Sequence, residues 1–406
     1  MNKDNVNKRG LYLFAVFLVL YEFSTYSTND MIMPGMLGVV KEFGGSLSVV
    51  GLSLSIYIFG STILQLCMGP LSERCGKRRL IIVGSSIFML ATILLIFSFS
   101  IKSFLLLRLL QGSGLAFISV GYSLIHENFS DKDAIKLTTL MGNVSVLAPL
   151  IGPMIGSLIV SYLNWRFVYV VTAILAVTSI YGLYRYTPNH DFTPKPIKIL
   201  EIIHNYKKVI INQNFRLGAM SISLLLVPSI AWIGLAPTML IKRLHLSYLD
   251  YSLYQLLAIG GFSISGILMQ FIAGKISFVK LLRAGNMLCV FGLCVFLFAF
   301  IAKDNLAKLT VVAAALLVYG FGCGLCNGTI IRLIVTEKSY SQNFAMALMI
   351  FNLTLVMVIS LEILNRISFI FDYSLNAFVC GCLFFIVLGN IGIYRLANRY
   401  QTRSWE

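Results

Sequence analysis

Charged residues are scarce in this chain. They make up 12% of its 406 residues, about half of the roughly 25% found in ordinary soluble domains. Hydrophobic residues reach 58%, and the mean hydropathy is +0.86. A composition so poor in charge excludes a water-soluble globule, and we expect a polytopic membrane protein.

Motifs for common membrane-protein chemistry are missing as well. The chain contains no GxxxxGK[ST] phosphate-binding loop, which argues against ATP-driven transport by this chain alone. It contains neither HExxH nor GxSxG, and its four histidines are scattered over span ends and loops. We therefore expect no enzyme activity, no cofactor and no bound metal.

Twelve apolar runs are each long enough to cross a bilayer, which takes about 20 helical residues. Their approximate ranges are 11–36, 49–71, 79–100, 103–126, 135–161, 165–186, 214–241, 250–273, 278–301, 308–335, 342–367 and 373–396. The prediction is an all-α polytopic membrane protein with twelve transmembrane helices.

A longer polar segment at 187–213 separates the first six runs from the last six. It predicts an N-terminal six-helix half at 1–186, a cytoplasmic linker at 187–213 and a C-terminal six-helix half at 214–406. Duplicated halves of this kind are common in secondary transporters.

Basic residues indicate how the chain crosses the membrane. The net charge is +16, from 32 Lys and Arg against 16 Asp and Glu. If both termini are cytoplasmic, 23 of the Lys and Arg fall on that side and eight on the other, in agreement with the positive-inside rule. The excess positive charge therefore reports topology and does not indicate nucleic-acid binding.

The first span carries two acids, Glu22 and Asp30, within YEFSTYSTND. A charge at the centre of a membrane helix costs about 2.5–3.5 kcal/mol, so such residues are retained where they pair or face water. Eight residues separate the two by ~12 Å along the axis and ~80° around it, so both can face one cavity. We expect a site for protons and cations. The alternatives are a structural carboxylate bound by nearby hydroxyls for Glu22 and a helix-end acceptor for Asp30.

Arg108, in LLLRLLQGSG, is the one guanidinium that we assign to the interior of a span rather than to either side of the membrane. Arginine does not deprotonate in proteins, so it cannot carry the proton itself but can hold a positive field beside an acid. The alternative is a side chain that extends outward to the interface, since Lys102 marks that edge. The following Gln-Gly-Ser-Gly favours burial against another helix.

The fifth predicted span contains APLIGPMIGS. Gly152 and Gly156 lie four residues apart on one face, a spacing typical of close helix packing, while Pro149 and Pro153 remove backbone donors. This pattern predicts a tightly packed, locally bent helix suited to gating. Three further charges are secondary candidates that also fit an interfacial position: Glu127, Arg332 and Glu362.

Three motifs together resemble the major facilitator superfamily, and its drug:proton antiporter group in particular. They are GPLSERCGKRR after the second span, LLRLLQGSG in the fourth and APLIGPMIGS in the fifth. The similarity extends over nearly the whole chain. It implies the six-plus-six fold with pseudo-two-fold halves.

The resemblance also implies roles for individual residues. Glu22 and Asp30 match the acids of the family's drug- and proton-binding cavity, and Tyr26 and Asn29 match cavity residues of the same span. Arg108 matches the essential arginine of the fourth span. Glu127 and Arg332 match charged positions implicated in function.

The loop motif is implied to hold the two halves together on the inner side and to govern the conformational change. Its residues here are Gly69, Glu73, Arg74, Gly76, Lys77 and Arg78. Glu73 stands where the family usually has Asp, and Lys77 where it usually has Arg. Both replacements keep the charge.

These observations predict an alternating-access exporter in the bacterial inner membrane with both termini cytoplasmic. The twelve spans leave no room for a soluble catalytic domain. Protons would enter at Glu22 and Asp30 and displace a lipophilic, often cationic substrate from a monomer in the lipid bilayer. Three other functions remain open: export of an endogenous metabolite or siderophore, import by symport, and a receptor or scaffold without turnover.

Overall fold

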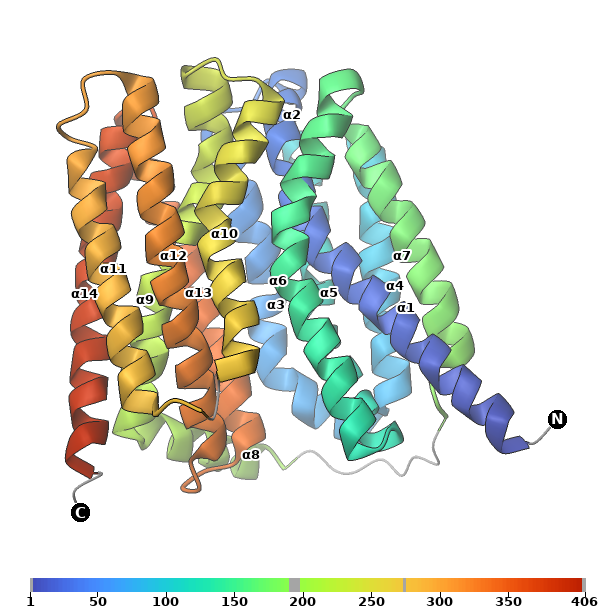
Figure 1. Cartoon of the computed structure of the whole chain (residues 1–406). Coiled ribbons are helices and arrows are strands. Elements are labelled where there is room, and N and C mark those ends of the chain that lie inside the picture. The colour runs from blue at the N-terminus through green and yellow to red at the C-terminus, as the bar shows by residue number, and fades with distance from the viewer. Residues whose placement is uncertain (1–2, 190–197, 273–274, 404–406) are drawn as a thin grey trace. The chain divides into compact units, whose positions relative to one another are not determined.

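The computed structural model describes residues 3–189, 198–272 and 275–403, and all regular structure in that part of the chain is helical (Figure 1). Twelve spans among the described residues are long and apolar enough to cross a membrane. The predicted all-α class with twelve membrane spans is therefore confirmed. Residues 190–197 of the predicted linker lie outside the described residues.

The chain divides into two compact units. Unit 1 comprises Met1–Gly44 and Ile56–Ile199, and unit 2 comprises Gly45–Ser55 and Leu200–Glu406. The boundaries that the sequence suggests, at 186 and 214, stay a prediction.

Unit 1 holds the helices that carry most of the candidate residues. They are α1 (Lys3–Met31), η1 (Met33–Gly35), α2 (Met36–Phe43), α4 (Lys77–Ile96), α5 (Ile101–Asn128), α6 (Asp131–Tyr162) and α7 (Arg166–Tyr186), with the greater part of α3 (Ser48–Cys75). Helix α1 packs against α5, α6 and α7, so it occupies the centre of this unit.

Unit 2 holds the remaining helices. They are α8 (Ile199–Ile211), α9 (Gln213–Ala236), the π-helical turn η2 (Pro237–Arg243), α10 (Tyr248–Ile272), α11 (Phe278–Phe298), α12 (Asn305–Thr336), α13 (Gln342–Ile370) and α14 (Leu375–Arg403). Helix α12 packs against α10 and α11, and α9 packs against α13 and α14.

The first span is interrupted at Pro34. Helix α1 ends at Met31, a 3-10 turn carries the proline, and α2 continues to Phe43. Proline has no backbone N–H and cannot continue the α-helical hydrogen bonding. Gly44, with φ +64°, ends α2 in the left-handed conformation, which glycine adopts without steric cost.

The predicted loop between the second and third spans is wrong in its extent. Helix α3 continues through Cys75 and α4 begins at Lys77, so most of the motif is helical and Gly76 alone joins the two helices. Gly76 has φ +83°, a conformation that residues with a Cβ rarely adopt. Pro70 is accommodated inside α3. The apolar run ends earlier than the helix because the last turns of α3 are polar.

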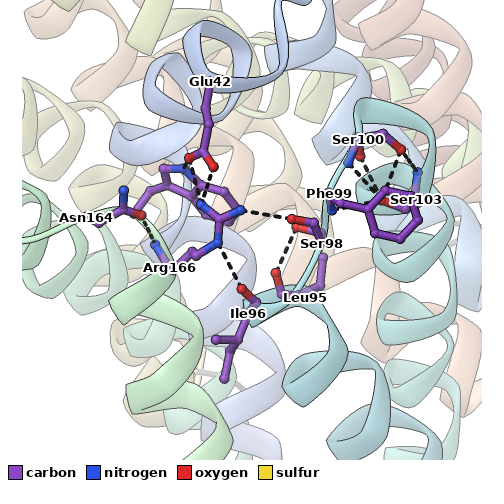
Figure 2. A network of polar contacts seen from close by, with 10 residues as sticks. Glu42, Leu95, Ile96, Ser98, Phe99, Ser100, Ser103, Asn164 and Arg166 are labelled. Atoms are coloured by element: carbon purple, nitrogen blue, oxygen red, sulfur yellow. Dashed lines mark hydrogen bonds and ion pairs between the residues drawn. The ribbon is translucent and has the colours of Figure 1, made fainter.

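A polar clamp joins three segments at one end of unit 1 (Figure 2). Arg166, at the start of α7, donates to both carboxylate oxygens of Glu42 on α2, at 2.5 and 2.7 Å. It also donates to the carbonyls of Ile96 and Ser98, each at 2.9 Å. Trp165 donates from its indole to Glu42 Oε2 at 2.8 Å. One guanidinium thus ties α2, the α4–α5 turn and the α6–α7 turn together.

Replacing Arg166 with Met is expected to lower the free energy of unfolding by about 1–3 kcal/mol, because hydrogen bonds from a charged donor are lost. Differential scanning fluorimetry in detergent would show a lower apparent Tm. Lys102→Met is the matched control, since it removes an exposed cation from α5. Equal Tm values for the two variants would contradict the structural role of the clamp.

Candidate functional site

An arginine is fully buried inside unit 1. Arg108 on α5 has 0% of its surface exposed, so its side chain does not extend to an interface. Its Nη2 donates to Asn29 Oδ1 on α1 at 2.7 Å, and its Nη1 donates to Gln111 Oε1 at 2.8 Å. The guanidinium carbon lies 4.3 Å from the centre of the Tyr57 ring on α3.

These contacts offset the cost of the buried charge. A charge at the centre of a membrane helix costs about 2.5–3.5 kcal/mol, whereas each hydrogen bond to a charged group contributes about 1.5–3 kcal/mol. A desolvated cation–π contact adds about 2 kcal/mol. Gln111 is itself held, because its Nε2 donates to Thr92 Oγ1 on α4 at 2.9 Å. These partners therefore stabilise the arginine in the bundle.

Asp30 joins the same group through its neighbour. It is 3% exposed, and Asn29 Nδ2 donates to its Oδ1 at 3.5 Å, the long limit of a hydrogen bond. Asn29 therefore contacts the acid through its amide nitrogen and Arg108 through its amide oxygen. Asp30 also interacts electrostatically with Arg108. The structure thus brings Asp30, Asn29 and Arg108 together.

Glu22 forms a second group, further along α1. It is 1% exposed, and the Tyr122 hydroxyl on α5 donates to its Oε1 at 3.1 Å. Tyr26, one turn later, interacts electrostatically with the carboxylate. Oε2 is buried and has no hydrogen-bond partner among the described residues. A buried carboxylate with an unsatisfied oxygen is costly when charged, so this group is suited to take up a proton or a cation.

Helices α1 and α5 run antiparallel past each other. Asn29 meets Arg108, and the Tyr21 hydroxyl donates to the Gly114 carbonyl at 2.8 Å. Glu22 then meets Tyr122 near the other end of α5. Glu22 and Asp30 are consequently two separate positions on one helix pair, ~12 Å apart along α1 at 1.5 Å per residue.

The proline- and glycine-rich segment of α6 packs directly on the acidic stretch of α1. A Cβ on Gly156 would lie 1.9 Å from the Met31 carbonyl oxygen, and one on Gly152 would lie 2.9 Å from the Ser27 carbonyl oxygen. The Gly152 position is also 3.4 Å from Asp30 Cβ. Both prolines, Pro149 and Pro153, lie inside α6. The two helix backbones therefore approach closely at the level of Asp30.

The motif between α3 and α4 is tied to α5 by charge. Lys77 Nζ forms an ion pair with Glu127 and donates to Ser123 Oγ at 2.7 Å. Arg78 Nη2 donates to the Tyr184 carbonyl on α7 at 3.1 Å. The motif's other residues are Gly69, Glu73 and Arg74 near the end of α3, all exposed, and the joining Gly76. The sequence predicts Lys77 as a residue of the motif and Glu127 as a separate secondary candidate. In the structure the two form one ion pair.

Two secondary candidates belong to unit 2. Arg332 on α12 lies with its guanidinium carbon 4.8 Å from the centre of the Phe278 ring. Glu362 on α13 accepts from Arg366 Nε at 3.5 Å, four residues later on the same helix.

Four partner residues were not predicted from the sequence: Tyr57, Thr92, Gln111 and Tyr122. Gln111 could have been found, since it follows Arg108 by three residues and residues at that spacing share a helix face. Tyr122 lies fourteen residues after Arg108, within about 40° on an ideal helix. Tyr57 and Thr92 lie on other helices, and nothing in their local sequence marks them.

Comparisons with known proteins agree on one family. The sequence model described as Major Facilitator Superfamily matches residues 18–361. The chain is 34% identical over 343 residues to the multidrug transporter MdfA of Yersinia pestis, covering 84% of this chain and 83% of that protein. It is 30% identical over 382 residues to the chloramphenicol resistance protein CraA of Acinetobacter baumannii, covering 94% and 91%.

Solved structures support the same fold at low identity. A D-xylose-proton symporter matches with a TM-score of 0.72 at 14% identity, covering 95% of this chain and 97% of that chain. A bacterial homolog of the human lysosomal transporter Spinster, inward-facing, matches with a TM-score of 0.68 at 13% identity, covering 98% and 97%. The fold class predicted from the sequence is confirmed.

Substituting Gly156 with Ala is expected to destabilise unit 1, because the new methyl group would overlap the Met31 carbonyl oxygen. Overpacking of this kind costs about 1–3 kcal/mol. Gly142→Ala is the matched control on the same helix, since nothing lies within 4 Å of its added Cβ. Thermal unfolding in detergent should separate the two variants. An unchanged Tm for Gly156→Ala would mean that α1 and α6 are not in close contact.

Proposed function

The chain belongs to the major facilitator superfamily, and from that membership we propose that it is a proton-coupled exporter of lipophilic, often cationic small molecules. Membership of a transporter family bears out the expectation that the chain is not an enzyme. The names of the relatives, multidrug transporter and chloramphenicol resistance protein, support a substrate class that includes drugs and toxic compounds.

The observation that carries the proposal is the pair of buried carboxylates on α1. Glu22 and Asp30 are 1% and 3% exposed, and a buried acid is stable when it is protonated or paired with a cation. A proton and a cationic substrate therefore compete for the same carboxylates. Competition of this kind produces exchange, because binding of one ligand requires release of the other.

The two acids take different parts in this scheme. Among the described residues, Glu22 has no cationic partner in its group, which holds the Tyr122 hydroxyl and the nearby Tyr26. Its negative charge would therefore be available to a substrate cation. Asp30 interacts with the permanent charge of Arg108 and shares Asn29 with it. Its protonation therefore changes the balance of forces within the α1–α5 contact.

The conformational change that closes one side of the site would be transmitted through two contacts. The first is the glycine surface of α6, namely Gly152 and Gly156, on α1 beside Asp30. The second is the Lys77–Glu127 pair between α4 and α5. A shift of α1 on protonation would displace α6 directly, because the two backbones are in contact. The displacement would be a step between two arrangements, because close-packed interfaces do not deform gradually.

The proposal includes a cellular setting. The transporter would act as a monomer in the bacterial inner membrane, with both termini cytoplasmic as the distribution of Lys and Arg favours. Its six-helix halves, 1–186 and 214–406, would alternate access around the site, with 187–213 as the cytoplasmic linker. The motif at Gly69 to Arg78 would then lie on the cytoplasmic side.

Purified protein is expected to release protons when ethidium is added to weakly buffered detergent solution. Glu22→Gln and Asp30→Asn should each reduce the number of protons released, and the double variant should release none, because no carboxyl group remains at the site. Asp131→Asn, an exposed acid at the start of α6, is the control and should leave the release unchanged. A pH indicator dye gives the measurement.

Outcomes of this experiment separate the rival functions. Full proton release by the double variant would show that the assignment of the acids is wrong. If neither ethidium nor neutral chloramphenicol causes proton release, and ethidium accumulation in expressing cells is unchanged, a multidrug exporter is excluded. A dedicated metabolite exporter or a scaffold is then favoured.

Reversing the Lys77–Glu127 pair provides a test of the gating contact. Glu127→Lys alone should slow ethidium export because it places two cations together, with an effect of about 1 kcal/mol or roughly fivefold. The swapped variant, Lys77→Glu with Glu127→Lys, should recover most of the rate. Export would be measured in inverted vesicles. Equal rates for the single and swapped variants would show that the pair does not act as a unit.

A further inference from the structure

Helix α8 is held at the end of a membrane span by its connection to α9. It ends at Ile211, and α9 begins at Gln213, the first residue of the seventh membrane span. The joining residue, Asn212, accepts from the Phe215 backbone N–H at 2.9 Å and donates to Ser339 Oγ at 3.2 Å. The C-terminal end of α8 therefore lies at the boundary of the bilayer.

One side of α8 packs on the rest of unit 2. Val209 is fully buried, and Tyr206 meets Phe344 on α13 edge to face, with ring centres 4.9 Å apart. These two side chains are three residues apart, so they share a face of the helix. The contacts fix how α8 is rotated about its axis. In Figure 1, α8 lies at the ends of the unit 2 spans.

The other side of α8 presents bulky aliphatic side chains that the described residues leave uncovered. Leu200 is 84% exposed, Ile203 56%, Ile210 48% and Ile211 64%. At 100° per residue these four lie within an arc of about 100°. In a soluble protein such a surface would be a liability, whereas at a bilayer boundary it can enter the lipid.

Basic residues accompany this apolar arc. Lys207 lies within it and Lys208 lies about 60° beyond its edge, both exposed. Long lysine side chains can place their stems along an apolar surface while the ammonium group reaches the headgroup region. Exposed aliphatic residues on one face with lysines beside them are typical of helices that lie in a membrane interface.

We propose that α8 lies in the membrane interface, with Leu200, Ile203, Ile210 and Ile211 among the acyl chains and Lys207 and Lys208 on anionic phospholipid headgroups. The partner is the lipid surface rather than a protein because the covalent junction at Asn212 already sets the helix at the bilayer boundary.

Spin labels at single cysteines test this orientation in the full chain. The accessible cysteines, Cys67, Cys75, Cys294 and Cys380, are first changed to Ser. One label is placed at Ile203→Cys, with Leu200→Cys as a second position on the same arc, and the control label is placed at Glu201→Cys, about 160° around the helix from Ile203. The protein is reconstituted in nanodiscs of phosphatidylcholine, with and without phosphatidylglycerol.

Collisions with oxygen, which concentrates in lipid, are compared with collisions with a water-soluble nickel chelate. At positions 203 and 200 oxygen collisions should exceed nickel collisions several-fold, and at position 201 the order should reverse. Nickel access at 203 equal to that at 201 would overturn the proposal. Low access to both reagents at 203 and 200 would also overturn it, because a protein segment would then cover the arc.

The lipid class is tested in the same samples. Phosphatidylglycerol should increase the oxygen-to-nickel ratio at 203, and Lys207→Gln with Lys208→Gln should abolish that increase without reversing the order of the two reagents. An equal ratio in both lipid mixtures would overturn the assignment of the lysines to anionic headgroups.

Discussion

The burial of Arg108 is the constraint on which the rest of unit 1 depends. A guanidinium cannot lose its charge in a protein, so the bundle must supply partners wherever it is placed. They include Asn29 on α1, Tyr57 on α3 and, through Gln111, Thr92 on α4. One permanent charge thus orients four helices relative to each other within this unit.

Helix α1 connects this charge to the parts of the unit that would move. On one side it presents Asn29 and Glu22 to α5, and on another its backbone touches the glycine surface of α6. Polar contacts change strength when an acid gains or loses a proton, whereas a backbone contact without side chains can only slide or separate. In the proposed exchange, the helix that carries both acids would therefore convert a protonation event into displacement.

Much of this arrangement could be predicted from single residues, and the remainder depends on pairs. The twelve apolar runs, the burial of Arg108 beside a glycine-rich stretch and the spacing of Gly152 and Gly156 are local signals, and the structure has the corresponding spans and contacts. The pairing of Lys77 with Glu127 spans fifty residues of sequence, and the approach of Tyr57 to Arg108 depends on how α3 packs on α5. Neither pairing can be recognised from the sequence around the residues that form it.

The extent of the α3–α4 connection was predicted wrongly because hydropathy marks where a membrane span ends, while Gly76 marks where the helix ends.

The central claim is that Glu22 and Asp30 lose protons when substrate binds. Infrared difference spectroscopy of the purified protein, recorded with and without ethidium, observes the carbonyl stretch of protonated carboxyl groups directly. Substrate should remove two such bands from the wild-type spectrum, one of which is missing in Glu22→Gln and the other in Asp30→Asn. A wild-type spectrum in which ethidium leaves every protonated carboxyl band in place would contradict the account.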